Sequence, residues 1–183
     1  MRALRQCVKA LLLEAALTPS SIPNNVKLYE EERSDAIFIA LVNVDELPSI
    51  EAALLGGITA SKWSNELWTV DSVSSVKGYG PLLYRLVMTR VTSFGGSLGA
   101  NPSGNTSLAK AAWDVFYQQS RVPSSGVTMA KPGDRPGYSL DSTDLEVMRA
   151  RGTIQLTPEQ AYEAKQLVCD LEVGGRRSEL DDD

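Results

Sequence analysis

The residues best suited to chemistry lie in one turn between a strand and a helix, Gly78-Tyr79-Gly80. A strand pattern from Leu67 to Ser75 leads into this turn, and an apolar helical pattern follows it from Pro81. Glycine adopts backbone angles that other residues avoid, and the first amides of a helix have no acceptor within that helix. The positive end of the helix dipole lies at the same place. We therefore expect the turn to suit an anion such as phosphate; the glycine pair alone leaves a tight turn without a ligand as the alternative.

The composition excludes several classes of catalytic site. The chain has no histidine and two cysteines, which excludes Ser-His-Asp and Cys-His catalysis, a histidine general base and most catalytic zinc sites. A metal site built from carboxylates alone stays open, but the sequence has neither EF-hand spacing nor a Walker glycine-lysine motif. We expect no metal.

The glycine turn resembles motif A of the GNAT superfamily of N-acetyltransferases. In that motif Gln or Arg, two residues, Gly, any residue, and Gly or Ala lie between the fourth strand and the third helix. The corresponding segment here is Ser75-Val76-Lys77-Gly78-Tyr79-Gly80, and the resemblance covers roughly residues 36–122. It implies a single α/β (α+β) domain with a GNAT-like mixed, mostly antiparallel central sheet flanked by helices, with an extra C-terminal helix.

The resemblance also implies a co-substrate. In the family the loop amides bind the pyrophosphate of coenzyme A, and a splayed strand beside the loop holds the pantetheine arm and presents the thioester carbonyl. It therefore implies an acyl-CoA-dependent N-acyltransferase that uses acetyl-CoA, with direct attack by a primary amine that the sequence does not identify. The coenzyme-binding residues that it indicates are Val73, Ser75, Val76, Lys77, Gly78, Tyr79, Gly80 and Leu82.

Two positions depart from the family pattern. Ser75 stands where the family has Gln or Arg, and Trp113 stands where many members place the tyrosine that protonates the departing thiolate. An indole N–H is a donor without useful acidity, so Trp113 is excluded as that acid. Tyr117 lies one turn later on the same helical face and is the candidate general acid, with a surface or core tyrosine as the alternative. The family's later helix pattern, Asn, two residues, Ala, two residues, Leu-Tyr, falls here on Thr106, Ala109, Ala112 and Trp113.

A general base is needed to deprotonate the acceptor amine. Asp71 and the pair Glu31 and Glu32 are the candidates, acting directly or through water. Solvated carboxylates at strand ends, without a catalytic role, are the alternative.

Three side chains near the glycine turn have open roles. Lys77 either pairs with a phosphate or is an exposed, solvated lysine. Tyr79 and Tyr84 are expected to pack or to contact adenine rather than to act as catalysts.

A second hypothesis is a catalytically inactive binding or virion-structural module with the same fold. The pattern around the turn and the later Ala-Ala-Trp helix is similar to compact GNAT-like proteins of tailed bacteriophages, some of which accompany the virion. The contact elements would be the amino-terminal helix, residues 121–144 and the acidic tail, and the partner a phage or host protein. The resemblance places the chain in the bacterial host cytoplasm or the phage virion.

Length and charge bound the remaining classes. A chain of 183 residues, 43% hydrophobic and 22% charged, suits one domain over 1–175 followed by a mobile acidic tail over 176–183. A net charge of −5 disfavours nucleic acid as a partner. Lys9 and Glu14 interrupt the amino-terminal apolar pattern, so we expect an amphipathic helix there and no membrane span. Cys7 and Cys169 are expected to be reduced core thiols, with a disulfide as the alternative.

Periodicity and turn residues predict the elements that position the turn. Residues 49–61 are ambiguous between helix and strand, and a strand is favoured because of Gly56-Gly57. The last helix has a capping-box pattern and should end at Gly174-Gly175. The expected elements are strands at Val26–Tyr29, Ala36–Val44, Leu67–Ser75 and Ser97–Gly99, helices at Pro81–Phe94, Asn105–Gln119 and from Pro158, and a long irregular connection over 121–144.

Overall fold

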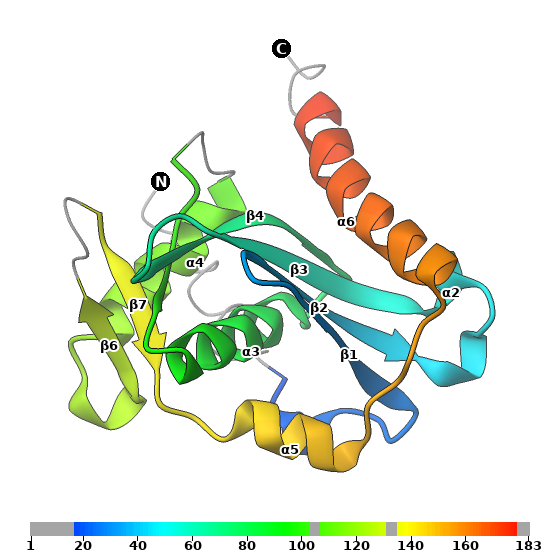
Figure 1. The fold of residues 1–183 in the computed structure, drawn as a ribbon, viewed down its shortest axis with the longest axis horizontal. Coiled ribbons are helices and arrows are strands. Elements are labelled where there is room, and N and C mark those ends of the chain that lie inside the picture. Colours follow the sequence, from blue (N-terminus) through cyan, green and yellow to red (C-terminus); the bar gives the residue numbers. More distant parts are fainter. Residues whose placement is uncertain (1–16, 103–106, 131–134, 179–183) are drawn as a thin grey trace.

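A seven-stranded sheet forms the centre of the computed structural model, which describes residues 17–102, 107–130 and 135–178 (Figure 1). The strands lie in the order β1-β2-β3-β4-β5-β7-β6, and β4 and β5 run parallel while every other neighbouring pair is antiparallel. This confirms a mixed, mostly antiparallel α/β architecture. The strands are β1 Val26–Glu32, β2 Ala36–Asn43, β3 Leu54–Lys62, β4 Leu67–Ser75, β5 Ser97–Gly99, β6 Val127–Ala130 and β7 Gly137–Leu140.

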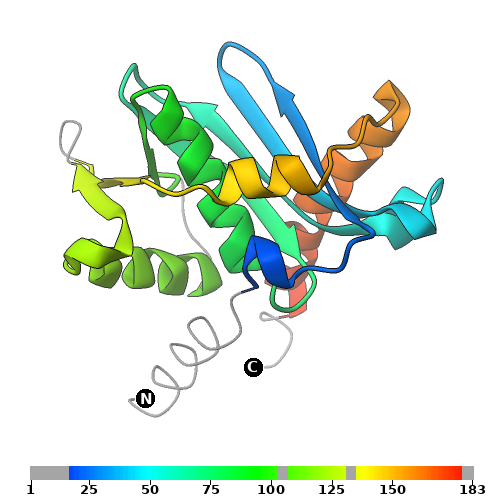
Figure 2. The same ribbon diagram turned by 90° about the horizontal axis from the view of Figure 1, so that it is seen from below.

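Helices cover both faces of the sheet. α3 and α5 lie on one face, and α6 crosses the other (Figures 1 and 2). The α-helices are α2 Ile50–Ala53, α3 Gly80–Ser93, α4 Ser107–Gln119, α5 Asp144–Arg151 and α6 Pro158–Ser178, and short 3-10 turns occur at Pro19–Ser21, Val44–Glu46 and Pro123–Ser125.

The alternation of side chains along β2 divides the core into two parts. Ile37, Ile39 and Leu41 belong to the cluster under α3, whereas Phe38 and Ala40 belong to the cluster under α6. Successive side chains of a strand point to opposite faces, so a strand covered on both faces reads as a continuous apolar run. This run makes β2 a central strand with no exposed face.

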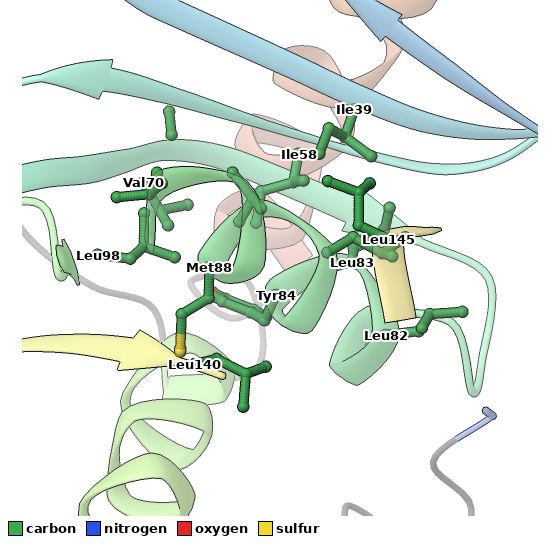
Figure 3. Packing of buried hydrophobic residues seen from close by; sticks show 14 of the residues in the cluster. Ile39, Ile58, Val70, Leu82, Leu83, Tyr84, Met88, Leu98, Leu140 and Leu145 are labelled. Carbon is green, nitrogen blue, oxygen red and sulfur yellow. The ribbon is translucent and has the colours of Figure 1, made fainter. Parts of the chain in front are cut away.

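The cluster under α3 fixes the helix that follows the glycine turn. Leu83 and Met88 of α3 pack with Ile58 and Val70 of the sheet and with Leu145 of α5 (Figure 3). All five side chains are at least nine-tenths buried. Burial of a large apolar side chain stabilises a fold by about 1.5–3 kcal/mol, so this packing holds the start of α3 rigidly against the end of β4.

The predicted strand at 67–75 and the short strand at 97–99 are both confirmed. The ambiguous segment 49–61 contains a helix and a strand: its first part forms the short helix α2, and the rest forms β3. The capping box of α6 is confirmed as well: the Gln160 amide donates to Thr157 Oγ1 at 3.2 Å, and the Thr157 amide donates to Gln160 Oε1 at 3.0 Å.

The sequence indicated a long irregular connection over residues 121–144, and this prediction is wrong in part. These residues contain the β6–β7 hairpin, which extends the sheet beyond β5. The strands have four residues each, and prolines, glycines and serines around them obscured such short patterns. α5 was not expected either, although its acidic first turn and its basic last turn suit a helix dipole.

Two further expectations need correction. α6 continues past Gly174-Gly175 to Ser178, so the glycine pair does not end the helix. Cys169 has a free thiol, but it is exposed rather than buried. Cys7, Thr106, the expected amino-terminal helix through residue 16 and the tail from residue 179 lie outside the described residues. Within the described part, the structure contains no helix with the length and apolarity that crossing a membrane requires.

Candidate functional site

The two edges of β4 have different partners. Toward β3, the strand pairs from Trp68 opposite Lys62 to Ser75 opposite Gly56. Toward β5, pairing is confined to the three residues from Leu67 to Thr69. Beyond Thr69, β4 and β5 separate, and no strand among the described residues pairs with this side of β4.

The main chain of Val73 and Ser75 faces the side that β5 has left. The Ser72 amide donates to Thr59 Oγ1 on β3 at 3.1 Å, and the Val76 amide donates to the Leu55 carbonyl at 2.9 Å. Because amides alternate in direction along a strand, those of Val73 and Ser75 point away from β3. We call this main-chain stretch, Val73–Ser75, the open β4 edge. An extended ligand with amide groups can pair with it as a strand would.

The glycine turn continues directly from the open β4 edge into α3. Gly78 has φ of +97°, a left-handed conformation that glycine adopts without strain. The Tyr79 amide donates to the Val76 carbonyl at 3.3 Å, and the Leu83 amide donates to the Tyr79 carbonyl at 3.1 Å. The remaining amides of the turn, which have no acceptor among the described residues, are those of Lys77, Gly78, Gly80 and Leu82.

Unengaged amides at the start of a helix are groups that bind anions in proteins, and a bound anion at this turn stays a prediction. The turn is also tightly packed, because a Cβ at Gly80 would lie 3.2 Å from Ser75 Oγ. Lys77 is exposed beside the amides, where its ammonium can approach a bound phosphate, and Val76 is also exposed.

Aromatic side chains join α3 to α4 one turn beyond the glycines. The Tyr84 and Trp113 rings lie 5.5 Å apart edge to face, and Trp113 stacks on Tyr138 of β7 at 5.9 Å. Phe116 contacts all three rings. The expectation that Tyr84 packs is confirmed. Tyr79 packs against the cluster under α3, and Leu82 is fully buried within that cluster.

Tyr117, the candidate general acid, lies at the surface of α4. Its side chain is 41% exposed, whereas Trp113 one turn earlier is buried. The Arg121 guanidinium lies 5.8 Å from the centre of its ring. The role of Tyr117 as an acid stays a prediction. The sequence did not single out Tyr138, where burial, followed by the nearby Tyr117 and Asp114, raises the pKa of the phenol.

Asp71 is the extra residue of a β-bulge in β4. The register changes there from Thr59 opposite Ser72 to Ala60 opposite Val70. A bulge bends the strand and re-aims a side chain, and bulges are frequent beside active sites. Partial burial raises the pKa of the Asp71 carboxyl, and a 2.9 Å hydrogen bond from Ser61 Oγ partly offsets this. A carboxylate with a raised pKa, two residues before the open β4 edge, is suited to accept a proton.

The other two candidate bases are engaged elsewhere. Lys165 of α6 donates to Glu31 at 2.6 Å and holds the pKa of that carboxyl below its usual range, and Arg90 of α3 donates to Glu32 at 3.0 Å. Both carboxylates lie on β1, three strand spacings from β4, which is roughly 14 Å. Their ion pairs tie β1 to helices on the two faces of the sheet. Asp71 is the candidate without an ion pair among the described residues, and its role as a base stays a prediction.

A polar row that the sequence analysis missed lies under α6. Thr59 Oγ1 and Ser72 Oγ are 2.8 Å apart, and Ser72 Oγ is 3.4 Å from Cys169 Sγ. Alternating Ser and Thr in β3 and β4 were the available signal. They give the sheet beside Asp71 a hydroxyl-lined surface on the face opposite α3.

Among the side chains that the structure describes, there is no group of three or more that could hold a metal ion. Comparisons with protein-family models, with curated proteins and with solved structures gave no match for this chain.

Proposed function

We propose that the chain is an acyl-CoA-dependent N-acyltransferase that transfers an acetyl group to a primary amine. One observation carries the proposal: the open β4 edge leads without interruption into a turn whose amides are unengaged at the start of a helix. The first part suits a chain of amides and the second suits a diphosphate. Coenzyme A has these two parts in series.

Different residues would bind different parts of the coenzyme. The amides of Gly78 and Gly80 would bind the pyrophosphate, with the dipole of α3 adding favourable potential. Lys77 would approach the same phosphates from solvent. The main chain of Val73 and Ser75 would pair with the pantetheine amides. The separation of the parallel strands β4 and β5 supports the proposal, because it leaves this length of β4 uncovered.

The reaction needs a base, an aligned thioester and an acid. Asp71, directly or through water, would take the proton that the ammonium of the acceptor must lose. The amine nitrogen then attacks the thioester carbonyl, so that a C–N bond forms and the C–S bond breaks, and the nitrogen gives up its second proton to water. Tyr117, the candidate acid, or water would protonate the leaving thiolate. Catalysis would come largely from alignment of the two substrates.

Calorimetric titration with acetyl-CoA tests the proposal. We expect micromolar binding by the native chain and none by Gly80→Val, because a larger side chain there would crowd Ser75 and displace the turn amides. Gly95→Ala is the control: that glycine ends α3 with φ of +75° and no atom within 4 Å of a Cβ. Absence of binding by the native chain, or equal binding by Gly80→Val, would contradict the proposal.

An inactive binding module is the second candidate. It is favoured by the burial of Trp113 in the aromatic cluster, at the position where the resemblance expects an acidic tyrosine. The absence of Gln or Arg at Ser75 points the same way. In this function the chain would bind a phage or host protein without coenzyme. Stable co-purification with such a protein in the absence of coenzyme supports it, whereas turnover that is lost in Tyr117→Phe excludes it.

A further inference from the structure

The two outer strands of the sheet, β1 and β6, differ in whether another segment of the chain pairs with their outer main-chain groups. Along β1, the Leu28 amide donates to the Gly152 carbonyl at 3.2 Å, and the Ile154 amide donates to the Leu28 carbonyl at 2.9 Å. Arg149 also forms a bidentate pair with Glu30 of this strand, with both distances 2.7 Å. The chain after α5 therefore covers the β1 edge at Leu28.

The β6 edge has no such cover among the described residues, where the sheet ends at β6. The Asp141 amide donates to the Gly126 carbonyl at 3.0 Å, and this sets the alternation of the β6–β7 ladder. Thr128 then directs its amide and carbonyl to β7, and Met129 directs both outward. The outward amide of Val127 is already satisfied by Ser125 Oγ at 3.1 Å. Met129 thus offers one donor and one acceptor at the open edge.

The side chains of β6 do nothing to protect this edge. The strand reads Val-Thr-Met-Ala, with Val127 buried, Met129 36% exposed, and Thr128 and Ala130 exposed. It has no charge and no proline within it. Natural edge strands are normally protected by charged side chains, prolines or bulges, because an open edge invites another strand. An uncharged edge whose donor and acceptor have no partner among the described residues is therefore a pairing surface.

We propose that β6 pairs antiparallel with β6 of a second copy of this chain, about a two-fold axis that passes between the two Met129 residues. In this register the outward amide of each Met129 meets the outward carbonyl of the other, so the same donor and acceptor are used twice. The two methionine side chains then lie opposite each other on the same face of a continuous sheet. A second copy fits because the edge is complementary to itself and has no charge that would face its own image.

The strength of the proposed dimer follows from the length of β6, and its salt dependence follows from the net charge of the chain. A four-residue strand buries little compared with the ~1,200–2,000 Å² of stable interfaces, so we expect a reversible dimer. Two copies, each with a net charge of −5, repel, so salt should strengthen the association.

Sedimentation equilibrium of the full chain from about 5 to about 500 μM tests the proposal, because it covers the range of weak interfaces. We expect a monomer–dimer equilibrium. It should be lost in Met129→Pro, which removes only an outward amide, and in Met129→Lys, which sets like charges opposite each other. Val147→Lys is the matched control, since it replaces an exposed apolar side chain on α5 by the same charge and should dimerise as the native chain does.

Thermal unfolding of each variant, followed by circular dichroism, shows that the fold is kept. A native chain that stays monomeric over the whole range would overturn the proposal. Dimerisation of Met129→Pro and Met129→Lys with native affinity would overturn it as well.

Discussion

The β1 edge and the open β4 edge both lack a neighbouring strand, but they differ in whether their outward main-chain groups have hydrogen-bond partners. Along β1, residues 152–154 satisfy the outward amide and carbonyl of Leu28, and the side-chain pair between Arg149 and Glu30 holds the segment beside the strand. Along β4 beyond Thr69, no described strand pairs with the outward groups, and the unengaged amides continue through the glycine turn. Proteins leave backbone groups unpaired only where water or a ligand reaches them. This difference is the reason that the proposed function places the coenzyme at the β4 edge and not at the β1 edge.

The largest expected effect is on turnover, at the bulge beside the open β4 edge. Asp71→Asn removes the proposed base, and we expect kcat to fall by about 10²–10⁴-fold with little change in acetyl-CoA affinity. Steady-state kinetics with an accepted amine measures it. Ser61→Ala, which removes only the hydrogen bond to this carboxyl, should have a much smaller effect. A kcat unchanged in Asp71→Asn would remove this residue from the mechanism.

The same variant should keep its stability. Because the folded pKa of Asp71 is raised, its ionised form opposes folding at pH values above that pKa, and this cost disappears as the pH falls below the usual range of aspartate. Asp71→Asn should therefore be at least as stable as the native chain at neutral pH. Denaturant unfolding at several pH values checks this, and a large loss at neutral pH would assign the carboxylate to the fold.

The next largest effect is on stability, and a matched pair of proline substitutions compares the two sides of β4. Ser74→Pro removes an amide that faces β3, so we expect the free energy of unfolding to fall by about 2–3 kcal/mol. Ser75→Pro removes an amide that faces the open side, so we expect a loss below about 1 kcal/mol together with weaker acetyl-CoA binding. Urea unfolding and calorimetry measure the two quantities. Equal losses of stability would mean that the outward side of β4 is not open.

A smaller effect separates two glycines with similar backbone conformations. Gly78 and Gly95 have φ of +97° and +75°, so alanine should cost about 1 kcal/mol of stability at either position. Only Gly78→Ala should weaken acetyl-CoA binding, by about tenfold, since that is 1.4 kcal/mol of lost amide contacts. Calorimetry on the two variants decides. The same loss of affinity in both would show a general effect of stability.

The smallest effect concerns the pairs that tie β1 to the rest of the fold. Lys165→Met breaks the contact with Glu31 and should cost about 0.5 kcal/mol. Because Lys165 lowers the pKa of Glu31, this stabilisation is present above the usual range of glutamate and is lost as the pH falls through the lowered pKa. The difference between variant and native chain in denaturant unfolding should therefore vanish in acid. A difference that is constant with pH would assign the effect to packing.

Local patterns predicted those elements that depend on near neighbours. The strand at 67–75, the start of α3 beside Pro81 and the capping box at Thr157 follow from side-chain period, fixed proline geometry and a local hydrogen bond. The hairpin at β6 and β7 did not, because its four-residue strands are held by contacts with β5 and α3 that no local pattern records.

The candidate site likewise has one part that the local sequence predicted and other parts that depend on tertiary contacts. The glycine turn was visible in the sequence, since two glycines and a proline define it. The open β4 edge was indicated only by resemblance, because it depends on where β5 ends its pairing with β4. Glu31 and Glu32 were proposed as bases alongside Asp71, and only the tertiary contacts of Lys165 and Arg90 separate them.

Residue-resolved hydrogen exchange with and without acetyl-CoA tests the central claim most directly. We predict that the coenzyme slows exchange at the amides of Val73, Ser75, Gly78 and Gly80, while the Ile154 amide at the covered β1 edge is unchanged. Exchange that acetyl-CoA at saturating concentration leaves unaltered at those four amides would contradict the account.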